Sequence, residues 1–215
     1  MTASFLLPLI LASAAITIYG EVATPARRGL IYVFKPLTTF LIIVLAASLP
    51  AEPAGSYRLA ILLGLVLSLV GDVILMLPGD HFVAGLAAFL LTHLAYLAAF
   101  TSEAALAAVP ATFLLFAIAE APILLVAWPS LHRRLRLPVL AYAAVLGAMA
   151  AQALTRAVLF PLPPAIAAAI GAALFAVSDS ALVYNRFVRP FRLSPLLVLT
   201  TYYIAQTLIA LSVAT

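Results

Sequence analysis

The chain has 215 residues, of which 67% are hydrophobic and only 8% are charged, with a mean hydropathy of +1.25. Soluble domains contain about 25% charged residues, so this composition excludes a soluble protein and identifies an integral membrane protein. The chain has no cysteine, which excludes disulfides and thiolate chemistry, and its arginines are not interleaved with aromatic residues, so we expect no nucleic-acid partner.

Eight apolar windows, each close to the ~20 residues that a membrane helix needs, follow one another along the chain. The connections between them are short and rich in proline and glycine, where helices end. The sequence therefore predicts one all-α domain over 1–215, a polytopic membrane protein with eight transmembrane helices. The expected spans are 4–20, 31–49, 58–77, 83–100, 107–127, 138–156, 164–184 and 195–214.

The first two spans carry few polar groups. No basic residue precedes the segment 4–20, as a cleaved signal peptide would require, so we interpret it as the first membrane helix. The second span carries Lys35. This side chain either snorkels to the interface or joins a polar layer with other spans, and the sequence leaves both readings open.

The third span carries Asp72 near its end. An isolated carboxylate at mid-membrane depth costs about 2.5 to 3.5 kcal/mol, so a chain that keeps one is expected to use it. Ala60, Gly64, Ser68 and Asp72 recur every four residues, which puts three small side chains and the carboxylate on one helix face. Helix packing explains the small residues but not the acid.

The fourth and eighth spans each carry a polar pair. His93 and Tyr96 lie three residues apart, and Tyr202 and Gln206 lie four apart, so each pair can point to one side of its helix. A single buried histidine or tyrosine is more often a packing residue than a functional one. Together, beside buried acids, these pairs favour a functional site.

The fifth and seventh spans carry further acids. Glu120 precedes Pro122 by two residues and is either a third acid of the site or part of a local bend, because proline removes a backbone donor. Asp179 lies near the end of the seventh span, with Ser178 and Ser180 beside it. We expect Asp72 and Asp179 to be catalytic. The candidate binding residues are Lys35, His93, Tyr96, Glu120, Ser178, Asn185, Tyr202, Tyr203 and Gln206.

The arginines predict the orientation. The loops after odd-numbered spans hold eight arginines and the other loops hold Arg58 and Arg156, so the odd loops are expected to be cytoplasmic and both termini extracytoplasmic, in a bacterial inner membrane. At about 1.5 Å per residue, five polar groups then lie about 6 to 10 Å from the cytoplasmic ends, with His93 about 15 Å deep. This layer contains Lys35, Asp72, Glu120, Asp179 and Tyr202.

An offset of 107 residues superimposes Asp72 on Asp179 and Gly64 on Gly171. Four spans separate the partners, so a four-plus-four parallel repeat would relate the two halves and make the aspartates face each other. Matches of alanine, leucine and valine arise by chance in apolar segments, so the glycine and aspartate coincidences carry this hypothesis.

Carboxylates at one depth suit three chemistries, namely a paired-aspartate hydrolase, an acid-base enzyme acting on a lipid, and a proton-coupled transporter. One histidine and scattered acids do not give the spacing of a zinc site, so we expect no metal and no cofactor. No serine has the surroundings of a nucleophile elbow.

Five sequence blocks resemble the YhhN family, which includes the animal lysoplasmalogenases of the TMEM86 type. They appear in family order and are Phe34–Leu37, Leu69–Leu77, Phe89–Tyr96, Phe175–Ser180 and Tyr202–Gln206. The resemblance implies an eight-span hydrolase that cleaves the vinyl ether bond of lysoplasmalogens to a fatty aldehyde and glycerophosphocholine or glycerophosphoethanolamine. The partners would be a lysophospholipid substrate and membrane lipid.

The chemistry of that reaction suits the residues. Protonation of the vinyl ether at its β-carbon gives an oxocarbenium ion that water captures, so one acid and one base suffice, and we expect Asp72 and Asp179 to divide these roles. Lys35 and nearby loop arginines would meet the phosphate. The alternative is a proton-coupled transporter or flippase for a small amphiphile, built on the parallel repeat.

Overall fold

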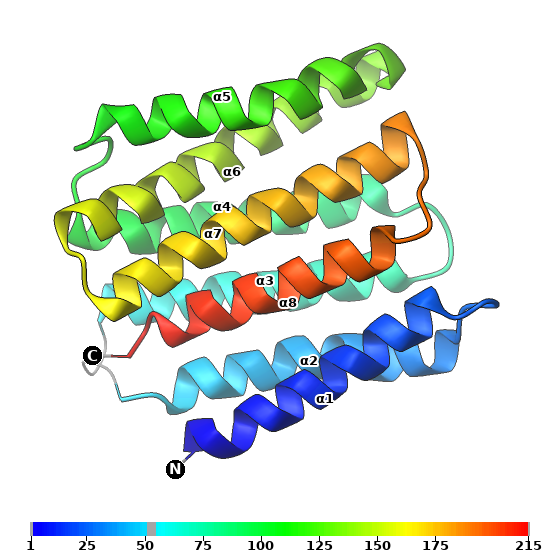
Figure 1. The fold of residues 1–215 in the computed structure, drawn as a ribbon, viewed down its shortest axis with the longest axis horizontal. Helices are drawn as coiled ribbons and strands as arrows, with labels where there is room; N and C mark the ends of the chain where they lie inside the picture. Colours follow the sequence, from blue (N-terminus) through cyan, green and yellow to red (C-terminus); the bar gives the residue numbers. More distant parts are fainter. Residues whose placement is uncertain (1, 51–54, 215) are drawn as a thin grey trace.

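The computed structural model describes residues 2–50 and 55–214, and these fold into eight long helices without a strand in either range (Figure 1). All eight are long and apolar enough to cross a membrane, which confirms the all-α, eight-span prediction. The helices are α1 Thr2–Val22, α2 Arg28–Ser48, α3 Ser56–Met76, α4 Phe82–Glu103, α5 Pro110–Ala127, α6 Arg133–Leu159, α7 Pro163–Val183 and α8 Ser194–Leu211.

The helix bounds differ from the expected spans by up to five residues. α5 begins at Pro110, because proline has no backbone N–H to leave unpaired in the first turn of a helix. α6 begins at Arg133, five residues before the expected start, and contains Pro138. The short helix η1, Trp128–Ser130, follows α5, and the π-helix η2, Tyr184–Val188, extends α7.

Consecutive helices run in opposite directions, so the loops after α1, α3, α5 and α7 gather at one end of the bundle (Figure 1). We name this the arginine-rich end, because eight of the chain's arginines lie in or beside these loops. The closest neighbours are α3 with α4, α7 with α8, and α1 with α2, while α8 also packs on α1, α2 and α3. α5 lies at the edge of the bundle against α6.

Glycine allows two of these contacts to be close. A Cβ atom at Gly64 of α3 would lie 2.3 Å from the ring of Tyr96 on α4, and one at Gly171 of α7 would lie 2.8 Å from the backbone oxygen of Ala205 on α8. Both distances are too short for a side chain to fit without movement. The small-residue face predicted on the third span is therefore a packing face, as such faces are in membrane bundles.

Some helix pairings correspond between the two halves and others do not, and the internal repeat itself stays a prediction. α2 packs on α3 as α6 packs on α7, and α3 packs on α4 as α7 packs on α8. α2 also contacts α8 as α6 contacts α4. Within the described ranges, however, α3 also packs on α8 and α7 on α5, and neither contact has a close counterpart in the other half.

Candidate functional site

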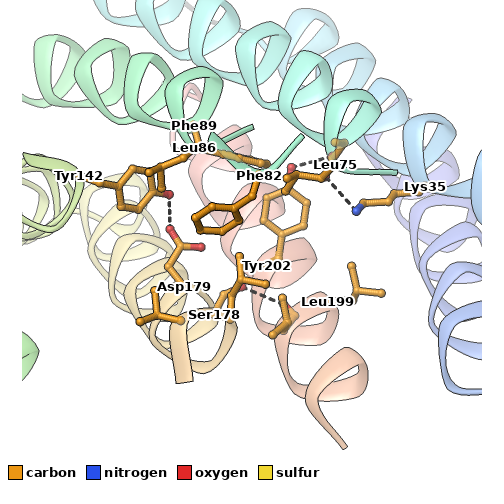
Figure 2. Close-up of a pocket in the computed structure, with 14 residues that line it drawn as sticks. Lys35, Leu75, Phe82, Leu86, Phe89, Tyr142, Ser178, Asp179, Leu199 and Tyr202 are labelled. Atoms are coloured by element: carbon orange, nitrogen blue, oxygen red, sulfur yellow. Dashed lines mark hydrogen bonds and ion pairs between the residues drawn. The ribbon is translucent and has the colours of Figure 1, made fainter. Parts of the chain in front are cut away.

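Both aspartates line one cavity of about 100 Å³ near the arginine-rich end of the bundle (Figure 2). Six helices contribute to it, so residues far apart in the sequence meet there. Most of its wall is apolar. The lining residues are Lys35, Asp72, Leu75, Phe82, Leu86, Phe89, Tyr142, Ser178, Asp179, Leu182, Val183, Val198, Leu199 and Tyr202.

Asp72 is held by three groups from two helices, α2 and α8, and is only 2% exposed. Thr39 Oγ1 of α2 donates to Asp72 Oδ2 at 2.6 Å, and the Tyr202 hydroxyl of α8 donates to the same oxygen at 2.7 Å. Lys35 Nζ lies 3.9 Å from Asp72 Oδ1. All three groups favour the ionised carboxylate, because two donate hydrogen bonds to it and the third is a cation.

Asp179 has a different set of partners. The Tyr142 hydroxyl of α6 donates a hydrogen bond to Asp179 Oδ2, and His93 Nε2 of α4 lies 3.4 Å from the same oxygen. His93 Nε2 also lies 2.9 Å from the Tyr142 hydroxyl, so the three side chains form one connected group. Within residues 2–50 and 55–214, no lysine or arginine pairs with Asp179.

The two carboxyl groups lie on different sides of the cavity. Figure 2 shows Tyr142 and Asp179 on one side and Lys35 on the other, with Phe82 and Tyr202 between them. The glycine that precedes Asp72 helps to shape this wall, because a Cβ at Gly71 would lie 2.7 Å from the ring of Phe89. Phe89 also packs edge-on against Tyr202, with 5.9 Å between ring centroids.

His93 is completely buried behind the cavity. Its ring packs edge-on against Phe175 of α7, with ring centroids 4.7 Å apart, and against Tyr142. Its Nδ1 atom has no hydrogen-bond partner within the described ranges 2–50 and 55–214. The ring therefore reaches the site through Nε2 alone, towards Tyr142 and Asp179.

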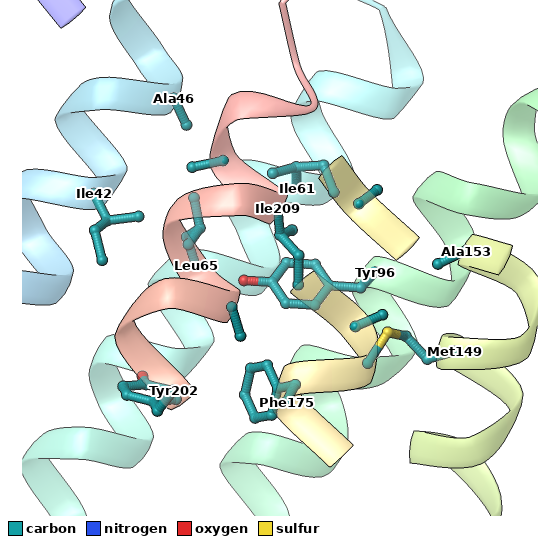
Figure 3. Close-up of a cluster of buried hydrophobic side chains, with 14 of the residues drawn as sticks. Ile42, Ala46, Ile61, Leu65, Tyr96, Met149, Ala153, Phe175, Tyr202 and Ile209 are labelled. Carbon is teal, nitrogen blue, oxygen red and sulfur yellow. The ribbon is translucent and has the colours of Figure 1, made fainter. Parts of the chain in front are cut away.

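Tyr96 and Gln206 form a separate polar chain that does not line the cavity. The Tyr96 hydroxyl donates to Gln206 Oε1 at 2.6 Å, and Gln206 Nε2 donates to Ser68 Oγ at 2.7 Å. Ser68 Oγ in turn donates to Thr92 Oγ1 at 3.2 Å. Figure 3 shows Tyr96 within the buried apolar cluster of the bundle. These contacts join α3, α4 and α8.

The other candidate binding residues occupy several places. Ser178 lines the cavity, but its hydroxyl donates to the backbone oxygen of Val198 at 3.0 Å. Glu120 lies in a neighbouring cavity of about 30 Å³ that Tyr142 and Asp179 also line. Tyr203 lines an apolar groove between α1 and α8, and Asn185 Oδ1 accepts a hydrogen bond from the Phe191 N–H in the loop after η2.

Sequence reasoning did not single out Thr39 and Tyr142. Thr39 follows Lys35 by one helical turn, so the spacing already placed it on the same face. Tyr142 lies nine residues after the start of α6, about 13 Å along the helix. Counting depth along every span would have found it, but nothing in its sequence surroundings distinguishes it from a packing tyrosine.

An ion pair lies beside the cavity at the arginine-rich end. Arg186 Nη2 donates to both carboxylate oxygens of Asp80, at 2.8 and 2.9 Å, and its guanidinium lies 4.2 Å from the centroid of the Phe82 ring. The Phe82 backbone N–H donates to Asp80 Oδ1. This N–H and the Arg186 guanidinium hold the pKa of the Asp80 carboxyl below its usual value.

The site contains acids, hydroxyls, one lysine and one imidazole. Over residues 2–50 and 55–214, no group of three or more histidine, aspartate or glutamate side chains has the geometry to hold a metal ion. What the arrangement offers is proton transfer between carboxyl groups and a molecule in an apolar cavity.

The chain is similar to known proteins over most of its length. The sequence pattern of the YhhN family matches residues 30–213. The chain is 37% identical over 161 residues to human lysoplasmalogenase TMEM86B, covering 75% of the chain and 66% of that protein. It is 37% identical over 153 residues to a lysoplasmalogenase of Mycobacterium bovis, covering 68% and 57% respectively.

A third relative matches over more of its own length. The uncharacterized membrane protein YhhN of Escherichia coli is 30% identical over 181 residues, which cover 84% of the chain and 86% of that protein. The chain thus spans less than two thirds of the length of the human and Mycobacterium bovis lysoplasmalogenases that it matches. No solved structure matches the chain significantly.

Proposed function

The chain belongs to the YhhN family, and from this premise we propose that it is an intramembrane hydrolase that cleaves the vinyl ether bond of lysoplasmalogens. Two relatives named lysoplasmalogenase support the substrate class. The observation that carries the proposal is that Asp72 and Asp179, from two separate helices, line the same cavity. The products would be a fatty aldehyde and glycerophosphocholine or glycerophosphoethanolamine.

The reaction needs one proton donor and one proton acceptor. The donor gives a proton to the β-carbon of the vinyl ether, and the double bond shifts to form an oxocarbenium ion. Water adds to the carbon next to oxygen and loses a proton to the acceptor. The hemiacetal hydroxyl then gives its proton to the deprotonated donor, the protonated acceptor gives its proton to the glycerol oxygen as the C–O bond breaks, and the aldehyde leaves with both acids restored. One water is consumed for each ether cleaved.

The contacts of the two aspartates favour different roles. Lys35 and the hydroxyls of Thr39 and Tyr202 stabilise Asp72 as a carboxylate, which suits it to orient water and to offset the positive charge of the oxocarbenium ion. Asp179 contacts the Tyr142 hydroxyl and His93 Nε2 and has no lysine or arginine partner among the described residues. We assign the proton donor to Asp179.

Tyr142 and His93 both contact the carboxyl group of Asp179. The tyrosine hydroxyl fixes the orientation of the carboxyl group, and His93 Nε2 lies close to both, so the two side chains position Asp179 towards the cavity. The apolar lining of Leu75, Leu86 and Leu199 suits the alkenyl chain next to the ether. The arginine-rich end would face the cytoplasm of a bacterial inner membrane, with both termini on the other side.

The experiment is an assay of purified protein in detergent with a vinyl-ether lysolipid, in which released aldehyde is measured. We expect turnover by the unsubstituted chain and its loss in Asp72→Asn and Asp179→Asn. Glu21→Gln is the matched control, because Glu21 is an acid that does not line the cavity. Full turnover by either aspartate variant would refute the proposed mechanism.

The transporter alternative predicts a different pattern. A proton-coupled carrier would release no aldehyde in detergent and would move an amphiphile across sealed vesicles when a proton gradient is applied. The buried acids suit either function. The aldehyde assay separates the two, because only a hydrolase releases aldehyde in detergent.

A further inference from the structure

The Asp80–Arg186 ion pair lies beside the cavity, at the arginine-rich end of the bundle. Asp80 is in the loop between α3 and α4, and Arg186 is in η2 after α7, so the pair joins two loops at the arginine-rich end. Arg186 reaches the cavity wall through Phe82, whose ring lies under its guanidinium and also lines the cavity. The pair is therefore next to the cavity and not on a remote surface.

Helix geometry links Arg186 to the acid of the site. Arg186 follows Asp179 by seven residues along α7 and the π-helix η2, and Val183 between them lines the cavity. At the α-helical rise, seven residues correspond to at most about 10 Å along the axis. In a lysoplasmalogen the three-carbon glycerol backbone separates the ether oxygen from the phosphate. An ether held at Asp179 would thus direct its phosphate along the helix towards Arg186.

Other cations at this end have different contacts. Lys35, which the sequence suggested for the phosphate, lies against Asp72 inside the cavity. The Arg27 guanidinium lies over the ring of Tyr19, and that of Arg136 lies over the ring of Trp128. Neither Tyr19 nor Trp128 lines the cavity. Arg186 combines a guanidinium with contact to the cavity wall.

We propose that Arg186 binds the phosphate of a lysophospholipid substrate, and that Asp80 occupies the guanidinium until the phosphate displaces it. This inference rests on the proposed function. A carboxylate and a phosphodiester both offer two oxygens to the N–H groups of one guanidinium, so one anion can replace the other. Breaking the ion pair costs little free energy because it is exposed, with 37% of the Arg186 side chain and 73% of the Asp80 side chain accessible.

The test compares two vinyl-ether substrates with the same alkenyl chain, a lysoplasmalogen with its phosphate head group and an alkenylglycerol without phosphate. For Arg186→Gln we expect KM to rise about 10-fold or more with the phosphate substrate and to stay within about 2-fold with the neutral one, since charge-assisted hydrogen bonds are lost in the first case only. Arg189→Gln is the matched control, an exposed arginine in the same loop, and should change neither KM.

Asp80→Asn is the complementary variant. It removes the competing carboxylate charge, so KM for the phosphate substrate should fall or stay unchanged, with no effect on the neutral substrate. An equal rise of KM for both substrates in Arg186→Gln would overturn the inference and indicate a structural role for the arginine. So would an unchanged KM for the phosphate substrate.

A binding measurement separates this inference from the proposed function. The probe is a saturated alkyl lysophosphocholine, which has no vinyl ether to cleave, with the matching alkylglycerol as the neutral ligand, each titrated by calorimetry. Arg186→Gln should weaken binding of the phosphate-bearing lipid alone. If Arg186→Gln weakens binding of the phosphate-bearing lipid alone, but the unsubstituted chain releases no aldehyde, the hydrolase proposal fails and the phosphate site stands. If Arg186→Gln binds both lipids as the unsubstituted chain does, the phosphate site fails.

Discussion

Lys35 Nζ lies 3.9 Å from Asp72 Oδ1 inside the bundle, and both side chains are at most 11% exposed. A lysine that snorkels would extend to the interface, whereas this one points to an acid on the neighbouring helix. The contact partly offsets the cost of holding two charged groups in an apolar setting, and removing one partner would leave the other uncompensated. Lys35 is thus placed to act on the carboxylate.

The first prediction concerns this contact. Lys35→Gln should lower kcat by about 10-fold or more, because the Asp72 carboxylate loses its cation and no longer offsets developing positive charge as well. The effect should be equal with phosphate-bearing and neutral vinyl-ether substrates, measured as aldehyde release. A loss confined to the phosphate-bearing substrate would show instead that Lys35 binds the head group.

The second prediction concerns the hydrogen bond from Tyr142 to Asp179. Tyr142→Phe keeps the ring that packs on His93 but removes the hydroxyl, so Asp179 loses its orientation and its link to His93. We expect kcat to fall by about 10- to 100-fold, below most of the ~100- to 10,000-fold range of a full general acid-base contribution, because Tyr142 acts through Asp179. The matched control is Tyr184→Phe, a tyrosine that does not line the cavity.

Unfolding of the Tyr142→Phe variant should be followed alongside the rate. Its thermal midpoint in detergent is expected within a few degrees of the unsubstituted chain, because the apolar contacts of the ring remain. A normal rate in Tyr142→Phe would remove the tyrosine from the mechanism.

The third prediction concerns the packing of α7 on α8. Gly171→Ala would place a Cβ 2.8 Å from the backbone oxygen of Ala205, and a backbone atom cannot swing away as a flexible side chain can. We expect a loss of about 1 to 3 kcal/mol in the free energy of unfolding, the usual cost of overpacking. Gly29→Ala is the control, since a Cβ there meets nothing within 4 Å.

Thermal unfolding of the purified variants in detergent provides the measurement. Gly171→Ala should unfold at a lower temperature than Gly29→Ala. Equal midpoints for the two variants would mean that α7 and α8 can separate slightly without cost, which contradicts close packing at this glycine.

The candidate site was partly readable in the sequence. Asp72 and Asp179 stand out because each is an acid within an apolar segment, and that contrast needs no knowledge of the fold. Tyr142 did not stand out, since a tyrosine in an apolar helix is equally suited to packing. Tyr96 shows the converse, because its spacing from His93 suggested a shared site although its hydroxyl belongs to the Gln206 chain.

The sequence by itself determined the eight helices. A membrane leaves each backbone N–H and C=O to be paired within its own segment, so apolar length and helix-breaking residues suffice to locate every span. Only the tertiary structure decided which side chains meet, because rotation of each helix and the order of its neighbours depend on close packing between particular small and large residues. Hydropathy, which averages over a whole segment, does not encode those contacts.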